Sequence, residues 1–511
     1  MPRKQNKGIV YLVGAGPGDP ELITAKGMRC IAEADVLIYD YLASRSLLEH
    51  ARPECECIYV GKQGGAHTLS QDGINALIVS KAASGKVVTR LKGGDPFIFG
   101  RGGEEAEELV KAAIPFEIVP GVTSAVAAPA YAGIPLTHRQ FTSTVAFITG
   151  HEDPTKNESS IDWTALAKGI GTLVFLMGVK NLPNIVSRLV QNGRSANTPA
   201  ALVQWGTTTR QKTVTGTLEN IQARAEAAGI KAPAVIVIGE VVALRDTLQW
   251  FETRPLLGRN IVVTRARAQA SDLIHQLTAL GARCLQCPTI EVKPPDSWDP
   301  LDQALRNIEQ YHWLIFTSTN GVQFFFRRLF EQGSDVRRLG HLRTAAIGPA
   351  TAESLRRYGL NTDILPKTYQ AESVVEAFSR VPVKGHKILL PRAREARPIL
   401  PEELQRMGAQ VDEIVAYQTI AVSHEQDTLI RALKERSIDM ITFTSSSTVR
   451  NFHSLLPRDT QPRELLQGVA TACIGPITAD TAKELGFTVD TIAKEYTISG
   501  LCEAVVHYFA S

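Results

Sequence analysis

The sequence of 511 residues lacks three features, each of which would point to a class of protein. No apolar run is long enough to span a bilayer, and Met1 is not followed by the basic and apolar segments of a secretion signal. A charge excess of one sign is also missing, because 55 Lys and Arg residues nearly balance 52 Asp and Glu residues, for a net charge of +3. We therefore expect a cytoplasmic protein with neither a membrane nor a nucleic acid as partner.

Cysteine is scarce as well, with seven residues in the whole chain. An odd number spread over so long a sequence is typical of reduced thiols. Two pairs are closely spaced, Cys55 with Cys57 and Cys284 with Cys287, but neither has a second pair nearby to complete a zinc site. We interpret these cysteines as structural and expect no metal.

The composition is otherwise ordinary for a globular protein, with 44% hydrophobic and 21% charged residues. The length exceeds what one hydrophobic core serves, so we expect roughly two to four domains. Short apolar runs alternate with helical segments along the chain, and this alternation predicts an α/β protein.

A glycine-rich run at residues 90–105 stands out in the first half of the chain. Residues 86–91 have the pattern of a strand, and the acidic residues from Glu104 onward are typical of the first turn of a helix. The glycines therefore lie on a strand-to-helix loop, where open α/β sheets bind their ligands. The loop could be no more than a tight turn, but the missing Cβ atoms would also let a flat ligand approach the backbone.

A second glycine loop, with the spacing G-x-G-x-G, follows an apolar strand at residues 9–13. Pro17 removes an N–H donor there and Asp19 adds a negative charge, which favours a ligand without phosphates. Asp40 follows the next strand, at a distance that would also suit a contact to a ribose. Polar candidates thus recur just after strands, at one edge of the predicted sheet.

Taken in order, the motifs between Gly8 and Leu244 resemble those of S-adenosylmethionine-dependent tetrapyrrole methyltransferases, and specifically uroporphyrinogen-III C-methyltransferases. The resemblance implies a two-lobed α/β domain over residues 1–245 that takes its methyl group from S-adenosyl-L-methionine. It also implies a tetrapyrrole substrate and a homodimer formed through this half. The motifs are Val13 to Thr24 (VGAGPGDPELIT), Tyr39-Asp40, Gly61-Lys62, Arg90 to Pro96 (RLKGGDP) and Pro135 to Arg139 (PLTHR).

The same resemblance implies roles for single residues. Asp40 would accept a proton and Lys62 would donate one. Arg101 and Arg139 could bind carboxylates of the substrate, although such residues are more often solvated surface charges. Met177, taken without this context, would be a core methionine. The implied contacts to the methyl donor are Pro17, Gly93, Gly94, Asp95, Ile98, Thr123, Ser124, Met177, Gly206 and Ala234.

These residue types suit the chemistry. A sulfonium methyl group is already electrophilic, so the enzyme mainly has to align it with an electron-rich pyrrole carbon. Methylation leaves a cationic ring, which a carboxylate such as Asp40 could stabilise before a proton leaves.

The second half follows residues 246–257, which we interpret as a linker, and contains an internal repeat with a spacing of about 127 residues. Each copy alternates short apolar strands with helical segments, which predicts two parallel α/β lobes with a cleft between them. The matched segments are 258–267 with 385–394, 314–319 with 441–446, and 346–352 with 473–479.

Residues 258–511 resemble the uroporphyrinogen-III synthases, a family that is weakly marked in sequence. The resemblance implies two flavodoxin-like lobes, with the chain crossing between them near Val292 and near Tyr417. One lobe would consist of residues 293–417, and the other would join residues 258–292 to 418–511.

The synthase reaction closes hydroxymethylbilane, a linear tetrapyrrole, with loss of water. By resemblance Tyr417 would be the proton donor, although a phenol is a weak acid at neutral pH. The resemblance places Thr478 in the cleft. Thr317, Ser318 and Ser446 stand at strand ends, where they could line the cleft or simply form turns.

We therefore interpret the chain as a bifunctional enzyme that forms uroporphyrinogen III and methylates it twice to precorrin-2. An alternative is a methylase of another corrin intermediate fused to a non-catalytic two-lobed ligand-binding module.

Overall fold

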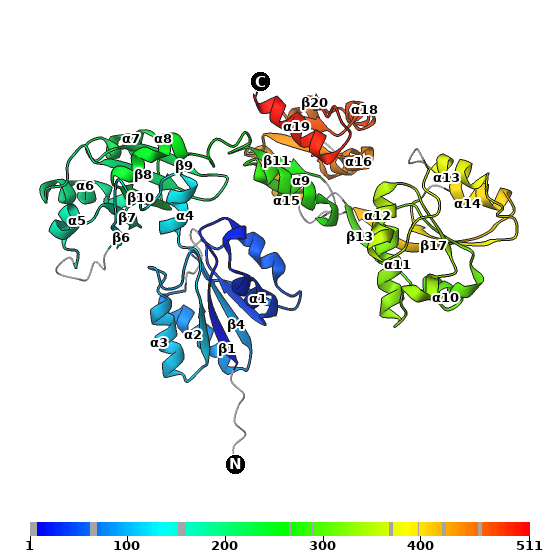
Figure 1. Ribbon diagram of the computed structural model, residues 1–511, viewed down its shortest axis with the longest axis horizontal. Helices are drawn as coiled ribbons and strands as arrows, with labels where there is room; N and C mark the ends of the chain where they lie inside the picture. Colours follow the sequence, from blue (N-terminus) through cyan, green and yellow to red (C-terminus); the bar gives the residue numbers. More distant parts are fainter. Residues whose placement is uncertain are drawn as a thin grey trace, which may run out of the picture. The chain divides into compact units, whose positions relative to one another are not determined.

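The computed structural model describes residues 8–61, 69–151, 160–264, 267–287, 290–366, 371–396, 398–421, 426–457 and 462–510. The chain forms two compact units. One unit is Met1–Arg259 together with Leu277–Arg283, and the other is Asn260–Gln276 together with Cys284–Ser511. Two five-stranded sheets belong to the first half of the chain and two to the second (Figure 1).

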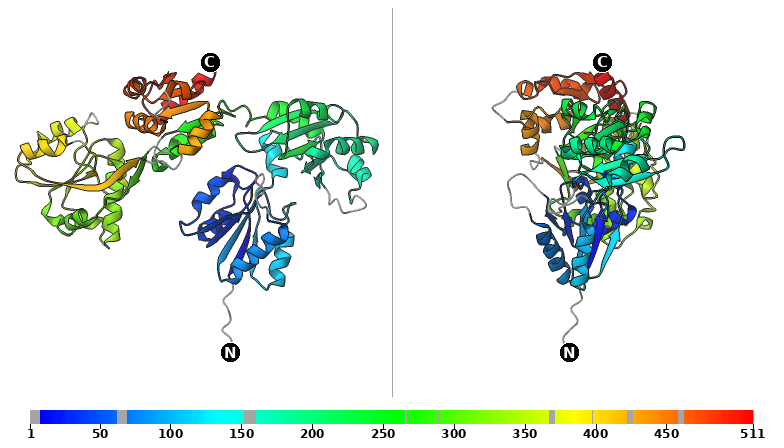
Figure 2. Two further views of the ribbon diagram at one scale, coloured as in Figure 1. Left: turned by 180° about the vertical axis from the view of Figure 1, so that it is seen from behind. Right: turned by 90° about the vertical axis from the view of Figure 1, so that its left-hand side faces the viewer.

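The first sheet is parallel, with the strand order β3-β2-β4-β1-β5. Helix α1 covers one face, and α2 and α3 cover the other, as the left view of Figure 2 also shows. The strands are β1 (Ile9–Gly14), β2 (Val36–Tyr39), β3 (Glu56–Tyr59), β4 (Val87–Lys92) and β5 (Phe116–Val119). The helices are η1 (Pro20–Leu22), α1 (Ala25–Glu33), η2 (Arg45–His50), α2 (Gln71–Ala83) and α3 (Gly102–Lys111).

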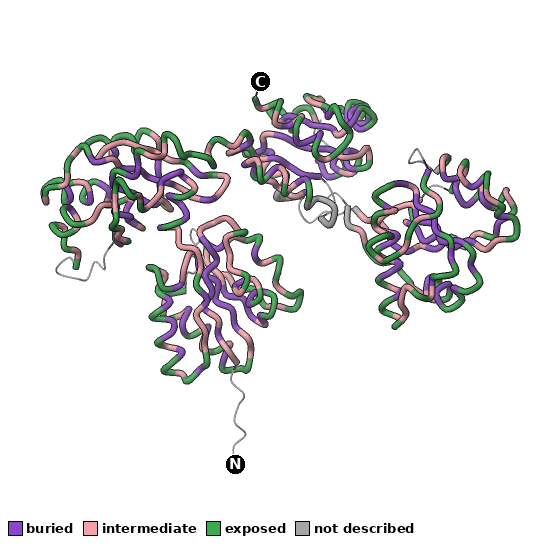
Figure 3. Tube along the Cα trace, in the orientation of Figure 1, coloured by how far each residue is buried: buried purple, intermediate pink, exposed green. Residues whose placement is uncertain are grey.

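Side chains on these strands alternate between two separate cores. On β1, Leu12 packs with α2 and α3, whereas Val13 packs with α1. On β4, Val88 lies in the core beneath α2 and α3, so Arg90 and Lys92 face the same side. The strands lie in the buried centre of the lobe (Figure 3). Two cations at such positions need buried partners.

The second sheet is mixed, with the order β6-β7-β10-β8-β9 and antiparallel pairing on both sides of β10. Helices α5, α6 and α7 cover one face, and α4 packs on the other. The strands are β6 (Val145–Thr149), β7 (Thr172–Leu176), β8 (Pro199–Gln204), β9 (Lys212–Thr217) and β10 (Ala234–Ile238). The helices are α4 (Ser124–Tyr131), α5 (Trp163–Gly169), η3 (Val179–Asn181), α6 (Leu182–Gln191), α7 (Ile221–Ala227), η4 (Glu240–Leu244) and α8 (Arg245–Leu248).

Residues 246–257, interpreted above as a linker, belong to the first compact unit. Phe251 is buried, and the Trp250 indole N–H donates to the Ala130 carbonyl at 3.0 Å. Glu252 pairs with Arg245 at 2.9 Å. At least the first part of this segment is therefore anchored by side chains.

The second unit contains one sheet with the order β13-β17-β16-β14-β15. Helices α10, α11 and α12 contribute to the core on one face, and α13 and α14 to the core on the other. The strands are β13 (Ile290–Lys293), β14 (Trp313–Phe316), β15 (Arg343–Ala346), β16 (Lys387–Ala393) and β17 (Gln410–Ala421). The helices are α10 (Asp299–Arg306), η5 (Ile308–Gln310), α11 (Thr319–Glu331), η6 (Val336–Leu339), α12 (Pro349–Arg357), α13 (Ala371–Phe378) and α14 (Ile399–Arg406).

The other sheet of this unit has the order β12-β11-β18-β19-β20. Its core includes side chains from α15, α16 and α18. The strands are β11 (Asn260–Val263), β12 (Arg283–Gln286), β18 (Met440–Phe443), β19 (Ala470–Cys473) and β20 (Thr491–Ile492). The helices are α9 (Arg267–Ala279), α15 (Gln426–Lys434), α16 (Ser446–Leu455), α17 (Pro462–Leu465), α18 (Pro476–Glu484) and α19 (Ile498–Ala510).

The two copies of the internal repeat exchange their first strands. β11 belongs to the first copy but pairs with β18 of the second, whereas β16 of the second copy pairs with β14 of the first. The two connecting segments run side by side as an antiparallel pair, β13 with the end of β17, where Val292 faces Thr419. This antiparallel edge departs from the parallel arrangement expected for this lobe, because two segments that cross in opposite directions meet there.

Three loops of the first sheet meet backbone to backbone. Gly14 ends β1, and Gly94 and Gly121 follow the neighbouring strands β4 and β5. A Cβ added at Gly121 would lie 2.3 Å from the Gly94 carbonyl oxygen and 2.6 Å from the Gly14 Cα. No side chain fits at this contact, so glycine is required for steric reasons.

We predict that Gly121→Ala destabilises the protein by about 1–3 kcal/mol, the typical cost of overpacking. Thermal unfolding of the full chain measures the effect as a lower melting temperature. Gly103→Ala is the matched control, because a Cβ added there meets nothing within 4 Å. Equal melting temperatures for the two variants would contradict the steric argument.

Candidate active sites

The two glycine loops singled out in the sequence lie directly against each other. The Gly94 N–H donates to the Gly16 carbonyl at 2.7 Å, and the Gly16 N–H donates to the Gly94 carbonyl at 3.3 Å. Both glycines have positive φ angles, +80° and +71°, which other residues rarely adopt. This bridge places Pro17 and Gly93 on adjoining loops at the carboxyl edge of the sheet.

Asp95 ties this pair of loops to the loop after β5. Its Oδ1 accepts from the N–H groups of Phe97 at 2.7 Å and Ile98 at 3.1 Å, and its Oδ2 accepts from the Gly121 N–H at 3.0 Å. The carboxylate therefore organises the loops, whether or not it also contacts a ligand. Ile98 remains 37% exposed, and the larger part of the Phe97 side chain is exposed too.

The first turn of α4 stands beside these loops. Thr123 caps the helix by accepting from the Ala125 N–H at 3.3 Å, and Ser124 is the first helical residue. The Cβ position of Gly94 lies within 4 Å of the Thr123 Cα and the Ser124 nitrogen. The remainder of α4 packs on the second sheet, so this helix connects the two lobes of the first unit.

Three further predicted contacts share one edge of the second sheet. Ala234 begins β10 and pairs with Gln204, which ends β8 just before Gly206. β7 pairs antiparallel with β10 on its other side, and Met177 directly follows the end of β7 at Leu176. Met177 is 53% exposed and has a φ angle of +57°, so it is not a core methionine.

The loop after β8 contacts the first glycine loop. The Asp19 N–H donates to Thr207 Oγ1 at 3.1 Å, and the Tyr131 hydroxyl donates to Asp19 Oδ2 at 2.8 Å. Burial, together with this bond to a carboxylate, raises the pKa of Tyr131. Asp19 therefore joins the two lobes, a role that its place in the sequence did not reveal.

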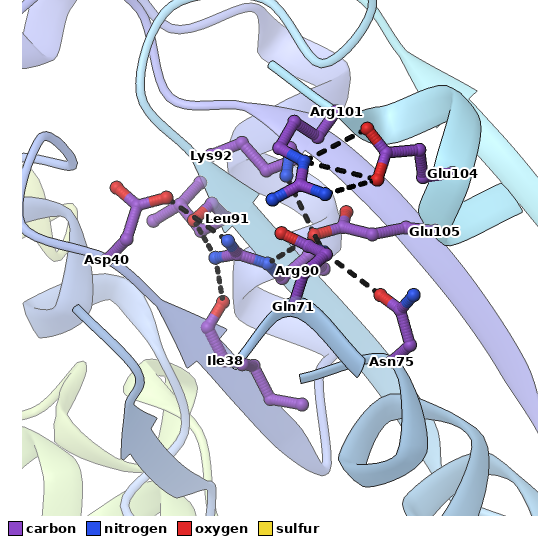
Figure 4. A network of polar contacts seen from close by, with 10 residues as sticks. All are labelled: Ile38, Asp40, Gln71, Asn75, Arg90, Leu91, Lys92, Arg101, Glu104 and Glu105. Atoms are coloured by element: carbon purple, nitrogen blue, oxygen red, sulfur yellow. Dashed lines mark hydrogen bonds and ion pairs between the residues drawn. The ribbon is translucent and has the colours of Figure 1, made fainter. Parts of the chain in front are cut away.

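Asp40 follows β2 and its side chain is 27% exposed. Its Oδ1 accepts from the Leu42 N–H at 3.1 Å, and its Oδ2 lies 3.2 Å from Nη2 of Arg90 (Figure 4). A Cβ added at Gly93 would lie 2.4 Å from the Leu42 Cβ, so the turn after Asp40 contacts the glycine-rich loop. The geometry thus brings the predicted proton acceptor next to the predicted cofactor loop.

The structure describes two of the three predicted cations of this half. Lys62 lies outside the described residues. Arg101 is exposed and pairs with Glu104 at the start of α3, with 2.9 Å between Nε and Oε1. Arg139 is exposed in the segment between α4 and β6.

In the second unit, Tyr417 and Ser318 are brought together from β17 and from the turn after β14. Their hydroxyl oxygens are 2.9 Å apart, and Ser318 also caps α11. Burial raises the pKa of Tyr417, so the phenol stays protonated at neutral pH. The Phe324 ring stacks on the Tyr417 ring with centroids 5.8 Å apart. Thr317 lies at the same strand end and is half-buried.

Ser446 and Thr478 lie at the starts of α16 and α18, the helices that follow strands β18 and β19 of the other sheet of the same unit. Ser446 Oγ donates to the Ile477 carbonyl at 3.3 Å and accepts from Thr481 Oγ1 at 2.8 Å. Thr478 follows Ile477 in α18 and is buried. Ser446 therefore connects the two helix starts.

Sequence reasoning missed the group of charges behind Asp40. Arg90 and Lys92 pair with Glu105 of α3, and all three side chains are buried. The signal that could have found them was present, since a central strand carried two cations at a spacing of two residues.

No helix in the described part of the chain is long and apolar enough to cross a membrane.

Comparison with known proteins divides the chain in the same way as its sheets. The family described as "Tetrapyrrole (Corrin/Porphyrin) Methylases" matches residues 9–222, and "Uroporphyrinogen-III synthase HemD" matches residues 271–503. The two matches define the class, a tetrapyrrole methylase followed by a synthase.

Individual relatives resemble the whole chain or one half. "Porphyrin biosynthesis protein HemD" of Ruminiclostridium josui is 36% identical over 499 residues, or 98% of each chain. "S-adenosyl-L-methionine-dependent uroporphyrinogen III methyltransferase" of Methanosarcina barkeri is 55% identical over 48% of this chain and 95% of its own. The crystal structure of uroporphyrin III C-methyl transferase from Thermus thermophilus, 39% identical, covers 46% of this chain and 100% of its own with a TM-score of 0.40.

The chain belongs to the family in which a tetrapyrrole methylase and a uroporphyrinogen-III synthase are fused in one polypeptide.

Proposed function

We propose that the chain carries out two consecutive reactions of tetrapyrrole biosynthesis. The second half closes hydroxymethylbilane to uroporphyrinogen III, and the first half methylates that product twice with S-adenosyl-L-methionine to give precorrin-2. The observation that carries the proposal is the meeting of the Gly16, Gly94 and Gly121 loops beside Asp40. The fusion is chemically coherent, because the product of one half is the substrate of the other.

The residues at this edge fit S-adenosyl-L-methionine. The ligand has no phosphate, and the first glycine loop carries a proline and the Asp19 carboxylate instead of a row of free N–H donors. The exposed side chains of Ile98 and Met177 offer apolar surface for an adenine ring. When bound, the cofactor supplies an electrophilic methyl group.

The chain's own groups then have two tasks. The glycine loops and the start of α4 align the methyl donor with the tetrapyrrole. Asp40, at the end of a buried strand, faces the positive charge that develops on the substrate and accepts the proton that leaves. Lys62 is proposed as the proton donor, and Arg101 and Arg139 as partners of substrate carboxylates.

In the second half, Tyr417 is proposed to assist loss of the hydroxyl group from the bilane. Its raised pKa suits a hydrogen-bond donor, and Ser318 orients the phenol. Thr317, which follows β14, and Ser446 and Thr478, at the starts of α16 and α18, are also proposed to contact the substrate.

The proposal extends to organisation. The methyltransferase comprises residues 1–245, the linker residues 246–257 and the synthase residues 258–511, with lobes of 293–417 and of 258–292 joined to 418–511. We propose a cytoplasmic homodimer formed through the methyltransferase half, with no nucleic-acid partner.

The two proposed reactions can be tested together. Purified full chain supplied with hydroxymethylbilane and S-adenosyl-L-methionine should yield a product with the mass of doubly methylated uroporphyrinogen III. Absence of both uroporphyrinogen III and methylated products would refute the proposal.

We predict that Asp95→Ala weakens binding of S-adenosylhomocysteine by about tenfold or more, because three loop N–H groups lose their acceptor, each worth about 1 kcal/mol. Calorimetric titration of the full chain measures the change. Asp162→Ala, which removes a helix cap on α5, is the control and should bind normally. Equal affinity in both variants would remove Asp95 from the site.

Asp40→Ala should lower the methylation rate by at least about a hundredfold, the usual contribution of a positioned acid or base, with S-adenosylhomocysteine affinity near wild type. Ring closure by the other half should be unchanged. Asp35→Ala is the matched control, because Asp35 precedes the same strand at its opposite end and accepts from the Val87 N–H. If Asp40 only caps the turn through Leu42, methylation will persist and stability will fall by roughly 1 kcal/mol.

Tyr417→Phe retains the stacked ring but removes the hydroxyl bonded to Ser318. We expect formation of the III isomer to fall by about tenfold or more, the equivalent of one hydrogen bond, while methylation of supplied uroporphyrinogen III continues. Separation of the I and III isomers by chromatography gives the readout. Tyr358→Phe, in the aromatic core of the same lobe, serves as control. An unchanged III fraction with Tyr417→Phe would exclude a role for the hydroxyl.

A further inference from the structure

Four charged side chains form one cluster beneath the carboxyl edge of the first sheet (Figure 4). Asp40 comes from the end of β2, Arg90 and Lys92 from β4, and Glu105 from α3. Two carboxylates and two cations balance each other. The side chains of Arg90, Glu105 and Lys92 are only 4%, 0% and 5% exposed, whereas that of Asp40 is 27% exposed. The cluster therefore extends from the core to the site.

Glu105 is the buried centre of the cluster. Its Oε1 lies 3.3 Å from Nε of Arg90 and 2.8 Å from Nζ of Lys92. Gln71 of α2 donates to the same oxygen at 3.3 Å. Glu105 thus ties β4 to both helices that cover it, and it fixes one side of the Arg90 guanidinium.

Arg90 connects this centre to Asp40. Its Nε faces Glu105, its Nη1 donates to the Leu91 carbonyl at 3.0 Å, and its Nη2 donates to Asp40 Oδ2 at 3.2 Å. All three nitrogens of the planar fork are engaged, so the guanidinium has one orientation. A lysine has a single point charge and cannot span Glu105 and Asp40 together in this way.

Asp40 has few other restraints. Besides the bond from Arg90, the Asp40 side chain accepts a hydrogen bond from the Leu42 N–H of the turn that follows, and Tyr41 and Leu42 of this turn are exposed. Each carboxylate oxygen has two lone pairs and uses one here, so both keep capacity for a proton. Arg90 is therefore the contact that relates the carboxylate to the rigid sheet.

We propose that Arg90, held by Glu105, is a positioning residue that keeps the Asp40 carboxylate in the orientation needed for methylation. The inference rests on the role proposed for Asp40. Lys92 completes the charge balance at Glu105 and directly precedes Gly93, so the same cluster also holds the start of the glycine-rich loop. Burial and the nearby Arg90 charge lower the pKa of Lys92, as expected for a tightly packed pair of cations.

The test is a double-mutant cycle on the full chain with Arg90→Lys and Asp40→Asn. Arg90→Lys keeps the charge and loses the fork. Alone, it should lower kcat for methylation by about tenfold to a hundredfold, as expected for a misplaced group. The KM for S-adenosyl-L-methionine and the affinity for S-adenosylhomocysteine should stay within about twofold of wild type. Added to Asp40→Asn, it should cause no further loss.

Glu105→Gln provides a second route to the same result if Arg90→Lys fails to fold. It retains the shape of the side chain but removes the charge that holds Arg90. We expect kcat for methylation to fall about as far as in Arg90→Lys. Combined with Asp40→Asn, it should cause no further loss. Glu108→Gln is the matched control, because Glu108 lies on the same helix and pairs with Lys111 at the surface. It should leave kcat unchanged.

The outcomes separate the inference from the proposed function. Wild-type kcat in both Arg90→Lys and Glu105→Gln, or losses that multiply with that of Asp40→Asn, would overturn the positioning role and leave Asp40 in place. Full methylation by Asp40→Asn alone would overturn the role of Asp40 and, with it, the inference. A parallel loss of S-adenosylhomocysteine affinity would show that the cluster only supports the cofactor loop.

Discussion

The methylase site depends on a contact that leaves no room for side chains. Gly14, Gly94 and Gly121 end or follow three adjacent strands, and their backbones approach so closely that one added Cβ would collide with a carbonyl oxygen. Because parallel strands present their carboxyl ends at one edge, this approach gathers the two glycine loops and the start of α4. Asp95 then secures the arrangement by accepting three backbone hydrogen bonds.

Buried charge is the second constraint on this lobe. Arg90 and Lys92 occupy positions on β4 that an apolar residue would fill, and Glu105 of α3 neutralises them. Such a group is costly to desolvate and stabilises a fold only when every charge has a partner. Its value here is geometric, since it joins a helix, a central strand and the partly exposed Asp40. The synthase half achieves a comparable result with neutral groups, the paired hydroxyls of Tyr417 and Ser318.

Many of the strands and several of the candidate site residues could be predicted from local sequence patterns. Apolar runs bounded by glycine predicted β1 and β4 closely, and the polar residues after them do lie at one edge. The Tyr417 phenol and the Ser318 hydroxyl, both named beforehand, share a hydrogen bond. Two residues lie in surroundings that differ from what their sequence context alone suggested. Met177 is exposed rather than buried, because it has left the strand with a positive φ angle. Asp19 joins two lobes, which spacing in a loop cannot reveal.

Turn chemistry and strand periodicity are local properties, so the order of loops and the two α/β halves could be read from the residues alone. Partner choice depends on packing between distant segments. The repeat does not say that β16, which pairs with β17 of its own copy, also pairs with β14 of the other copy, because backbone hydrogen bonds between strands carry little sequence information. Likewise, Arg90 and Glu105 are separated by a loop and helix start that could face either way. Only the folded sheet places both side chains on the same face, where Arg90 contacts Glu105 through Nε and Asp40 through Nη2.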